Sequence, residues 1–141
     1  MLEDIMKIKI ILRLFVFFFM VENVWAKTPA PLEVKGAITV STKRAKSLMN
    51  QGATFIDVRR AVDYQSSHIQ WAIHLDLKLD LTESSLLAVV RKNQAVVIYC
   101  NGDMCQRSAL ASEQAVTWGW QKVYYYRGGF PDWKEAGLSV E

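Results

Sequence analysis

A short apolar run followed by a helical segment most constrains the fold of this chain. The run spans Ala95–Tyr99 (AVVIY), and residues 107–118 (RSALASEQAVTW) have helix-forming character. Because the run is continuous and β-branched, it suits a strand buried on both faces of a parallel sheet. Cys100 follows at the carboxyl end of this strand, where ligands collect in open α/β sheets. The sequence therefore predicts a cysteine displayed between a buried strand and a helix N-terminus.

The residues that follow Cys100 favour an anionic sulfur. A helix N-terminus and loop amides attract negative charge, and Arg107 adds a cation. These groups lower the pKa of a nearby thiol, because they stabilise its charged form. We therefore expect Cys100 to ionise readily and to be reachable from solvent.

Predicted strands and helices alternate along the rest of the chain. The expected strands cover 53–58, 72–75 and 122–126, and the expected helical segments cover 43–50, 63–67, 81–91 and 131–136. Such alternation predicts an α/β fold with a parallel sheet and helices on both faces.

Capping residues support the predicted helix ends. Ser41 or Thr42 can cap the helix over 43–50, and Thr82 can cap the helix over 81–91. Gly52 and Gly137 stand where helices are expected to end, because glycine tolerates a left-handed backbone.

Two features are expected near the same edge of the sheet as Cys100. Asp57 ends a predicted strand and is followed closely by Arg59. We favour Asp57 as a hydrogen-bond acceptor for loop amides or an arginine, with acid/base chemistry as the alternative. The pair Gly128-Gly129 indicates either a close backbone approach or a plain turn.

Residues 1–26 are predicted to be a signal peptide. Three basic residues precede an apolar run over 14–21, and Val24-Trp25-Ala26 offers a signal-peptidase site. We expect cleavage after Ala26, with Met6 as an alternative start and a periplasmic or secreted product. An uncleaved membrane anchor is the other possibility, but a spanning helix needs roughly 18 apolar residues. Residues 27–35 are then expected to be a linker and residues 36–141 a single domain.

The charge of the chain excludes a nucleic-acid-binding function. The formal net charge is +3, and removing residues 1–26 leaves it unchanged because three basic and three acidic residues are lost together. There is no basic run, and the small excess fits at most a small anionic substrate.

The two cysteines leave several redox states open. Cys100 and Cys105 are five residues apart, so an exported protein could hold them as a structural disulfide, a reversible disulfide or free thiols. No histidine or cysteine pair has zinc spacing, since His68 and His74 are six apart. We expect no metal and no cofactor.

Four segments, in this order, resemble the rhodanese domain of the single-domain sulfurtransferase type. They are GAITVSTKRAKSLMNQGATFIDVRRAVDYQSSHI, AIHLDL, VVIYCNGDMCQRSA and VYYYRGGFPDWKEAGLSVE. The resemblance covers 36–141 and implies an α/β, rhodanese-like fold with a roughly five-stranded parallel sheet.

The resemblance also implies that Cys100 carries sulfur as a persulfide. It would attack the outer sulfur of a small anionic donor such as thiosulfate and deliver it to cyanide, a thiol or a protein acceptor. Asp57, Arg59 and His68 would hold the loop and the strand ends in place. The residues expected to form the substrate-binding loop are Asn101, Gly102, Asp103, Met104, Cys105, Gln106 and Arg107.

The chain departs from the family pattern at several positions. Six residues separate Cys100 from Arg107, whereas sulfurtransferases usually have four and phosphatase and arsenate-reductase relatives five, so a wider pocket is expected. Asp103 would hinder anion binding if it pointed inward, and we expect it to point out. Ser67 and Trp71 replace family glycines, and Trp71 is expected to alter packing beside the neighbouring histidine.

Three classes of function remain in view. The first is an active sulfurtransferase, the second is a persulfide carrier or binding module without turnover, and the third is a thiol redox or oxyanion (arsenate or phosphate) enzyme using Cys100 and Cys105. In the third class Cys105 is a resolving thiol, whereas in the simplest alternative it is a small apolar side chain that packs the loop. None of these requires nucleic acid or stable membrane insertion after signal removal.

Overall fold

A five-stranded parallel sheet forms the centre of the molecule. The computed structural model describes residues 1–5 and 28–141. The sheet has the order β1-β5-β4-β2-β3 and every neighbouring pair is parallel. The strands are β1 (Ile38–Thr39), β2 (Thr54–Asp57), β3 (Ile73–His74), β4 (Ala95–Tyr99) and β5 (Lys122–Tyr126). The α/β class and the parallel sheet are thus confirmed, and the carboxyl ends of all strands meet at one edge.

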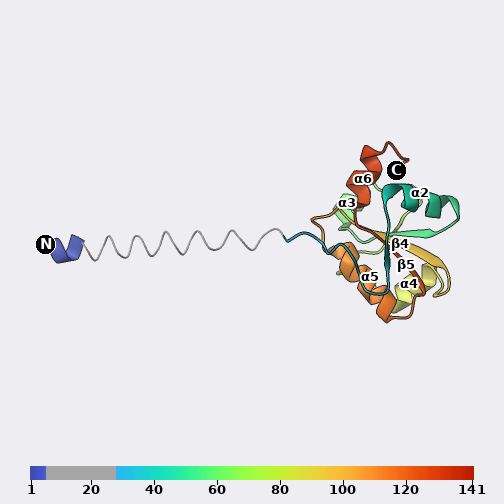
Figure 1. The fold of residues 1–141 in the computed structure, drawn as a ribbon, viewed down its shortest axis with the longest axis horizontal. Coiled ribbons are helices and arrows are strands. Elements are labelled where there is room, and N and C mark those ends of the chain that lie inside the picture. Colours follow the sequence, from blue (N-terminus) through green and yellow to red (C-terminus); the bar gives the residue numbers. More distant parts are fainter. Residues whose placement is uncertain (6–27) are drawn as a thin grey trace.

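Helices cover both faces of the sheet (Figure 1). On one side lie α4 (Glu83–Val89) and α5 (Arg107–Thr117), and on the other lie α2 (Thr42–Asn50) and α6 (Gly129–Glu135). The short helix α3 (Ala61–Ser66) follows β2. This arrangement explains the continuous apolar character of β4, whose residues are buried on both sides.

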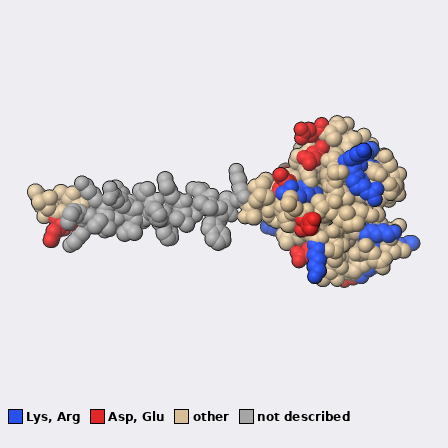
Figure 2. Space-filling model, viewed as in Figure 1, with Lys and Arg blue, Asp and Glu red and all other residues tan. Residues whose placement is uncertain are grey.

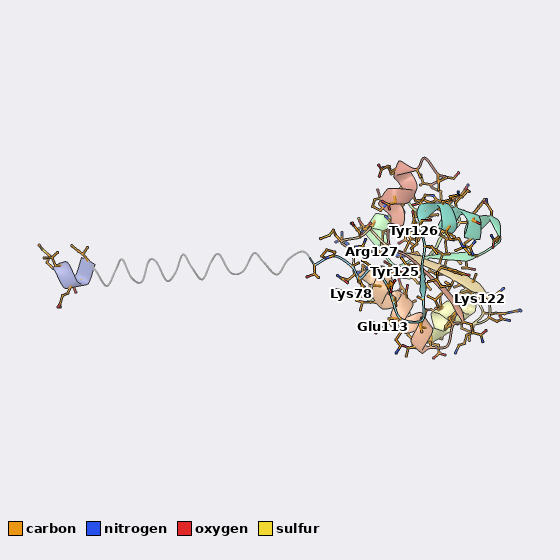
Figure 3. All side chains as sticks on the ribbon, in the orientation of Figure 1. Lys78, Glu113, Lys122, Tyr125, Tyr126 and Arg127 are labelled. Carbon is orange, nitrogen blue, oxygen red and sulfur yellow. The ribbon has the colours of Figure 1, made fainter. Side chains whose placement is uncertain are left out.

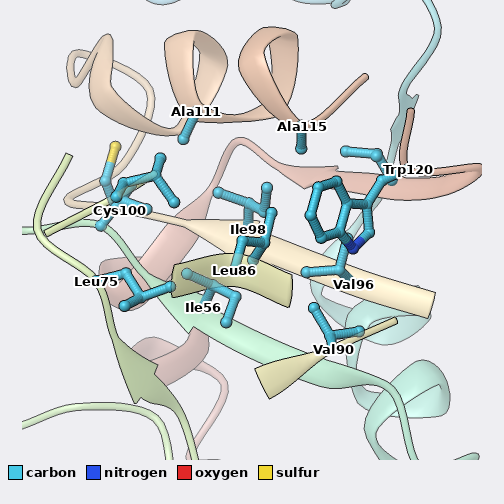
Figure 4. Close-up of a cluster of buried hydrophobic side chains, with 13 residues drawn as sticks. Ile56, Leu75, Leu86, Val90, Val96, Ile98, Cys100, Ala111, Ala115 and Trp120 are labelled. Atoms are coloured by element: carbon cyan, nitrogen blue, oxygen red, sulfur yellow. The ribbon is translucent and has the colours of Figure 1, made fainter. Parts of the chain in front are cut away.

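Side chains of β4 alternate between two cores. Val96 and Ile98 belong to the cluster under α4 and α5, together with Leu86 and Ala111 (Figure 4). The opposite core is built on the other face of the sheet from Phe55, Val97, Tyr99, Ala45, Leu48 and Trp133. Cys100 lies at the edge of the first cluster, immediately after β4.

The helix ends follow the predicted capping chemistry. Ser41 caps α2 by accepting a hydrogen bond from the backbone N–H of Arg44, and Thr82 forms a capping box with Ser85 at the start of α4. α6 begins at Gly129, two residues before the predicted start at Pro131. A proline is accepted there because backbone N–H groups in the first turn have no partner within the helix.

The segment predicted as a linker packs against the domain. Ala30 and Val34 are 3% and 8% exposed, and the Ala30 N–H donates to the carbonyl oxygen of Asp103 at 2.7 Å. Tyr125 donates its hydroxyl proton to the Pro31 carbonyl, and Arg127, which lies beside Tyr125 in Figure 3, donates to the Ala30 carbonyl. Residues 28–34 are therefore part of the folded unit.

The predicted signal peptide falls mainly on residues 6–27, which lie outside the described part of the chain. Within residues 1–5 and 28–141, no helix has the length and apolar character needed to cross a bilayer.

Candidate active site

The loop between β4 and α5 rests on the backbone at the start of α6. The N–H of Phe130 donates to the Cys100 carbonyl at 3.0 Å. A Cβ at Gly129 would lie 2.3 Å from that carbonyl oxygen, and Gly129 has φ +61°. Of the two possibilities that the glycine pair left open, a close backbone approach and a plain turn, the structure shows the close approach.

Cys100 is enclosed within this loop. It is 0% exposed, and its Sγ lies 3.3 Å from the Cys105 carbonyl oxygen and 3.1 Å from Ser108 Oγ. Burial raises the pKa of the Cys100 thiol, and contact with the Cys105 side chain raises it further. The expectation that Cys100 is reachable from solvent is wrong, because the Cys105 carbonyl and the side chain and backbone N–H of Ser108 lie against its sulfur.

Cys105 is the more accessible of the two cysteines. Its side chain is partly exposed, and interaction with the Cys100 thiol lowers the pKa of Cys105 below its ordinary value. The backbone N–H groups of Asn101 and Arg107 also lower the pKa of Cys105. Both cysteines are free thiols in this structure.

Arg107 is fixed beside the loop by two acceptors from other strands. Its Nε donates to the Val58 carbonyl at 2.7 Å, and its Nη2 donates to Asp76 Oδ1. Burial opposes ionisation of Asp76, but the Lys78 backbone N–H and Arg107 outweigh it and lower the Asp76 pKa. The sequence analysis missed Asp76, and the signal available was a carboxylate just after the predicted strand over 72–75.

Asp57 and Arg59 form a buried pair under the loop. The Arg59 guanidinium donates to Asp57 Oδ2 at 2.7 Å, and the Tyr99 hydroxyl donates to the same oxygen at 2.7 Å. Arg59 Nη1 lies 3.4 Å from Asn101 Oδ1, which connects the pair to the loop. Asp57 thus serves as an acceptor for an arginine, the role favoured by its position at the end of β2.

The Rhodanese-like domain family profile matches residues 41–136 of this chain. The chain belongs to the rhodanese-like domain family. It is 32% identical over 92 residues to the thiosulfate sulfurtransferase GlpE of Actinobacillus pleuropneumoniae, covering 65% of this chain and 81% of that protein. This relative is a thiosulfate sulfurtransferase, and the chain is a sulfurtransferase-like enzyme.

Solved structures agree with this rhodanese-like fold. The polysulfide-sulfur transferase of Wolinella succinogenes matches with a TM-score of 0.57 and 25% identity, covering 75% of this chain and 79% of that one. The human single-domain sulfurtransferase TSTD1 matches with a TM-score of 0.59 and 22% identity, covering 70% and 96%.

His68 is held by Tyr64 and by the C-terminal residue Glu141 rather than by the 100–107 loop. Its ring stacks on Tyr64 with centroids 3.7 Å apart, and its Nδ1 lies 2.9 Å from the Tyr64 carbonyl oxygen. Backbone hydrogen bonds join His68 to Glu141 in both directions. His68 therefore holds the end of the chain, and its connection to the loop is indirect, through the Arg59 hydrogen bond to the Ser67 carbonyl.

The remaining loop residues differ in exposure. Asp103 points out as expected, with 66% of its side chain exposed and Arg127 Nη1 at 4.0 Å from its carboxylate. Gly102 is buried, with φ +104°. The other exposed members of the loop are Asn101, Met104 and Gln106.

The two substituted family glycines behave differently. Trp71 keeps a glycine-like backbone with φ +66°, and the residue is 70% exposed, so it does not pack beside His68 as expected. Ser67 has φ −174°, which is extended backbone that any residue adopts.

A groove lies beside the cysteine loop. It has a volume of about 480 Å³ between the N-terminal segment and α5, and its lining includes Val34, Gln106 and Leu110 but neither cysteine. The reacting sulfur is therefore outside this groove. Within the described residues, no group of three or more His, Cys, Asp or Glu side chains could hold a metal ion.

Proposed function

We propose that this protein is an exported rhodanese-type sulfurtransferase. It takes sulfane sulfur from a small anionic donor such as thiosulfate, holds it as a persulfide on Cys100, and passes it to a thiophilic acceptor, either a small thiol or a protein. The observation that carries this proposal is the position of Cys100 between β4 and α5, where its sulfur accepts a hydrogen bond from the Ser108 backbone N–H at 3.3 Å beside the fixed cation of Arg107. Such a setting stabilises both a thiolate and a persulfide anion.

The loop supplies electrostatic stabilisation and needs no general base. A thiolate attacks the outer sulfur of the donor, and the inner sulfur leaves with its oxygens as sulfite. The amides that surround the thiolate stabilise the persulfide that replaces it, because both are anions. Charge of both signs is spread over the face seen in Figure 2, and the exposed Asp103 is turned away from the thiols.

Export is supported by the sequence features of residues 1–26. Cleavage after Ala26 would leave residues 28–31, which contact the loop, within the mature chain. The intact mass of protein taken from the exported fraction without reductant tests this directly. A chain beginning at Lys27 is expected, and a full-length chain retained in the membrane would contradict it.

Turnover with thiosulfate and cyanide tests sulfur transfer. Wild-type protein is expected to produce thiocyanate, and the double variant Cys100→Ser/Cys105→Ser is expected to produce none, because it has no thiol. Leu79→Ser is the control, since Leu79 is 80% exposed and outside the loop. Turnover by the double variant would overturn the proposal.

The same assay separates the other two classes of function. Wild-type protein that becomes one sulfur atom heavier without producing thiocyanate is a persulfide carrier. Hydrolysis of an aryl phosphate or reduction of arsenate, with no sulfur adduct, would identify an oxyanion enzyme. Either result would contradict the sulfurtransferase proposal.

A further inference from the structure

The loop that carries Cys100 holds a second cysteine that the proposed sulfur transfer does not use. Cys105 is the only other cysteine of the sequence, and it is partly exposed whereas Cys100 is buried. Cys100 belongs to the apolar cluster under α5, and Cys105 packs against the same cluster. Two groups with sulfur chemistry therefore share one short loop.

The backbone of the loop brings Cys105 back to the sulfur of Cys100. The N–H of Cys105 donates to the Gly102 carbonyl at 3.0 Å, so residues 102–105 form a turn. The Cys105 carbonyl oxygen then lies 3.3 Å from Cys100 Sγ. The thiols also act on each other: burial and then the Cys105 side chain raise the pKa of Cys100, and Cys100 is the main cause of the lowered pKa of Cys105.

Hydrogen bonds on both sides of Cys105 hold it in this position. The Asp103 carbonyl accepts from the Ala30 N–H at 2.7 Å, and Gln106 Nε2 donates to the carbonyls of residues 28 and 29, each at 3.0 Å. The folded state therefore keeps the two thiols together. A reaction between groups held in this way is favoured over the same reaction with a thiol from solution.

A persulfide on Cys100 has two sulfur atoms with different access. Cys100 is 0% exposed, and the Ser108 N–H and hydroxyl lie against Cys100 Sγ, which becomes the inner sulfur. An acceptor from solvent therefore attacks the outer sulfur. Attack on the inner sulfur needs a nucleophile inside the loop, and a cysteine thiolate is a far better one than a serine hydroxyl. Cys105 is the residue that meets this need.

We propose that Cys105 is a second catalytic thiol, which attacks the inner sulfur of the Cys100 persulfide and releases the carried sulfur as hydrosulfide. This inference rests on the proposed sulfurtransferase function, in which Cys100 takes sulfur from the donor, and it adds a second outcome for that sulfur. An external acceptor and Cys105 compete for the same persulfide, but they attack different atoms of it.

The step balances in atoms and electrons. The Cys105 thiol gives up its proton, and its sulfur forms a bond to Cys100 Sγ. The S–S bond of the persulfide breaks, and the outer sulfur leaves with the bonding pair and takes up the proton as hydrosulfide. The carried sulfur gains two electrons, and the two cysteines lose them by forming a disulfide. A dithiol reductant restores both thiols by thiol–disulfide exchange and is itself oxidised to a disulfide.

Treatment with thiosulfate in the absence of an acceptor tests the step in wild-type protein. Reduced protein, freed of reductant and kept under nitrogen, is expected to release sulfite and then an equal amount of hydrosulfide. The chain should end two hydrogen atoms lighter than the reduced form, whereas a blank without thiosulfate stays reduced. A lasting product that is one sulfur atom heavier would contradict the proposal.

Peptide mapping locates the new bond. Residues 93–107 form one tryptic peptide that contains both cysteines. After thiosulfate treatment, and without added reductant, this peptide is expected to resist alkylation and to have the mass of an internal disulfide. If Cys105 is alkylated in it while Cys100 retains the added sulfur, Cys105 does not attack the persulfide.

Substitution of each cysteine separates the two steps. Cys105→Ser is expected to release sulfite but no hydrosulfide, and to remain one sulfur atom heavier. Cys100→Ser is expected to release neither product, because the first step needs Cys100. Leu79→Ser is the control and should match wild type, since Leu79 is 80% exposed and outside the loop. Hydrosulfide release by Cys105→Ser at the wild-type rate would refute the role of Cys105. If this variant releases no sulfite, the wild-type peptide decides alone.

Added cyanide measures the competition between the two outcomes and lets the two proposals fail separately. Wild-type protein is expected to divide its sulfur between thiocyanate and hydrosulfide, and Cys105→Ser is expected to give thiocyanate alone. If wild-type protein yields neither sulfite nor thiocyanate, the sulfurtransferase function is wrong. If it yields thiocyanate, but its persulfide persists when cyanide is omitted, the function holds and the role of Cys105 is wrong.

Discussion

At the scale of single residues, Gly129 sets how closely the cysteine loop approaches α6. Its φ of +61° is a left-handed conformation, and a Cβ there would lie 2.3 Å from the Cys100 carbonyl oxygen and 3.0 Å from the Gly102 nitrogen. Glycine is required for both reasons, since other residues are strained at this φ and no side chain fits. The position of the reacting thiols thus depends on a residue that takes no part in the chemistry.

Replacing this glycine is expected to destabilise the protein and displace the loop. Gly129→Ala should lower the free energy of unfolding by about 3 kcal/mol, from backbone strain and overpacking together. Gly137→Ala is the matched control, because Gly137 also has positive φ (+70°) but nothing within 4 Å of its Cβ position. Its expected cost is about 1 kcal/mol, from backbone strain alone.

Urea unfolding measures both variants, and thiocyanate turnover measures the loop. Turnover is expected to fall in Gly129→Ala and to persist in Gly137→Ala. If the two variants lose the same stability, the contact of Gly129 with the Cys100 carbonyl has no energetic importance.

At the scale of elements, the segment over residues 28–31 is a strap across the cysteine loop. Gln106 Nε2 donates to the carbonyls of Thr28 and Pro29, each at 3.0 Å. The N–H of Ala30 donates to the Asp103 carbonyl at 2.7 Å. Asp103 and Gln106, at the two ends of the exposed part of the loop, are therefore both hydrogen-bonded to the N-terminal segment.

Loss of the Gln106 side chain is expected to loosen the strap. Gln106→Ala removes two hydrogen bonds, which together contribute about 2 kcal/mol to local stability. Amide hydrogen exchange at Ala30 is expected to become faster by a corresponding factor. The control is Gln51→Ala, which removes an exposed hydrogen bond to Ser47 far from the loop in sequence. Unchanged exchange at Ala30 in Gln106→Ala would show that the strap is held by other contacts.

At the scale of the whole molecule, Arg107 joins parts of the chain that are far apart in sequence. It links the start of α5 to Val58 after β2 and to Asp76 after β3. Asp76 is 3% exposed, so this ion pair is largely removed from water. Removing one partner of such a pair leaves a buried charge without its counter-charge. This lowers the free energy of unfolding by more than the loss of a surface ion pair does.

The Asp76 pair gives the fold a definite pH dependence. Because the folded state lowers the pKa of Asp76, its contribution is present above the unfolded pKa and is lost as pH falls through the lower folded value. Asp76→Asn is expected to be less stable than wild type at pH 7 by about 2 kcal/mol, and the difference should shrink below about pH 4.

Thermal unfolding from pH 7 to pH 3 checks this expectation. The control is Asp80→Asn, since Asp80 is an exposed carboxylate on the same loop. A constant difference between wild type and Asp76→Asn across this range would contradict the role assigned to the ionised carboxylate.

Much of the fold was predictable because its signals are local. The bounds of β4 and β5 follow from apolar β-branched and aromatic runs, and the ends of α2 and α4 follow from the caps at Ser41 and Thr82. β1 was not predicted, because two residues carry no periodicity and pair only through β5. The close approach at Gly129 was one of the two possibilities that the glycine pair left open.

The sequence by itself determined that strands and helices alternate, that a parallel sheet results, and that a cysteine loop lies at its carboxyl edge. Only the tertiary structure decided which sulfur in that loop faces solvent and which faces the core. The reason is physical: exposure and pKa depend on the groups that pack around a thiol, here Ser108, the Cys105 carbonyl and the core under α5. Those neighbours are assembled by the fold, so the position of Cys100 after its strand could not reveal that its partner is the accessible thiol.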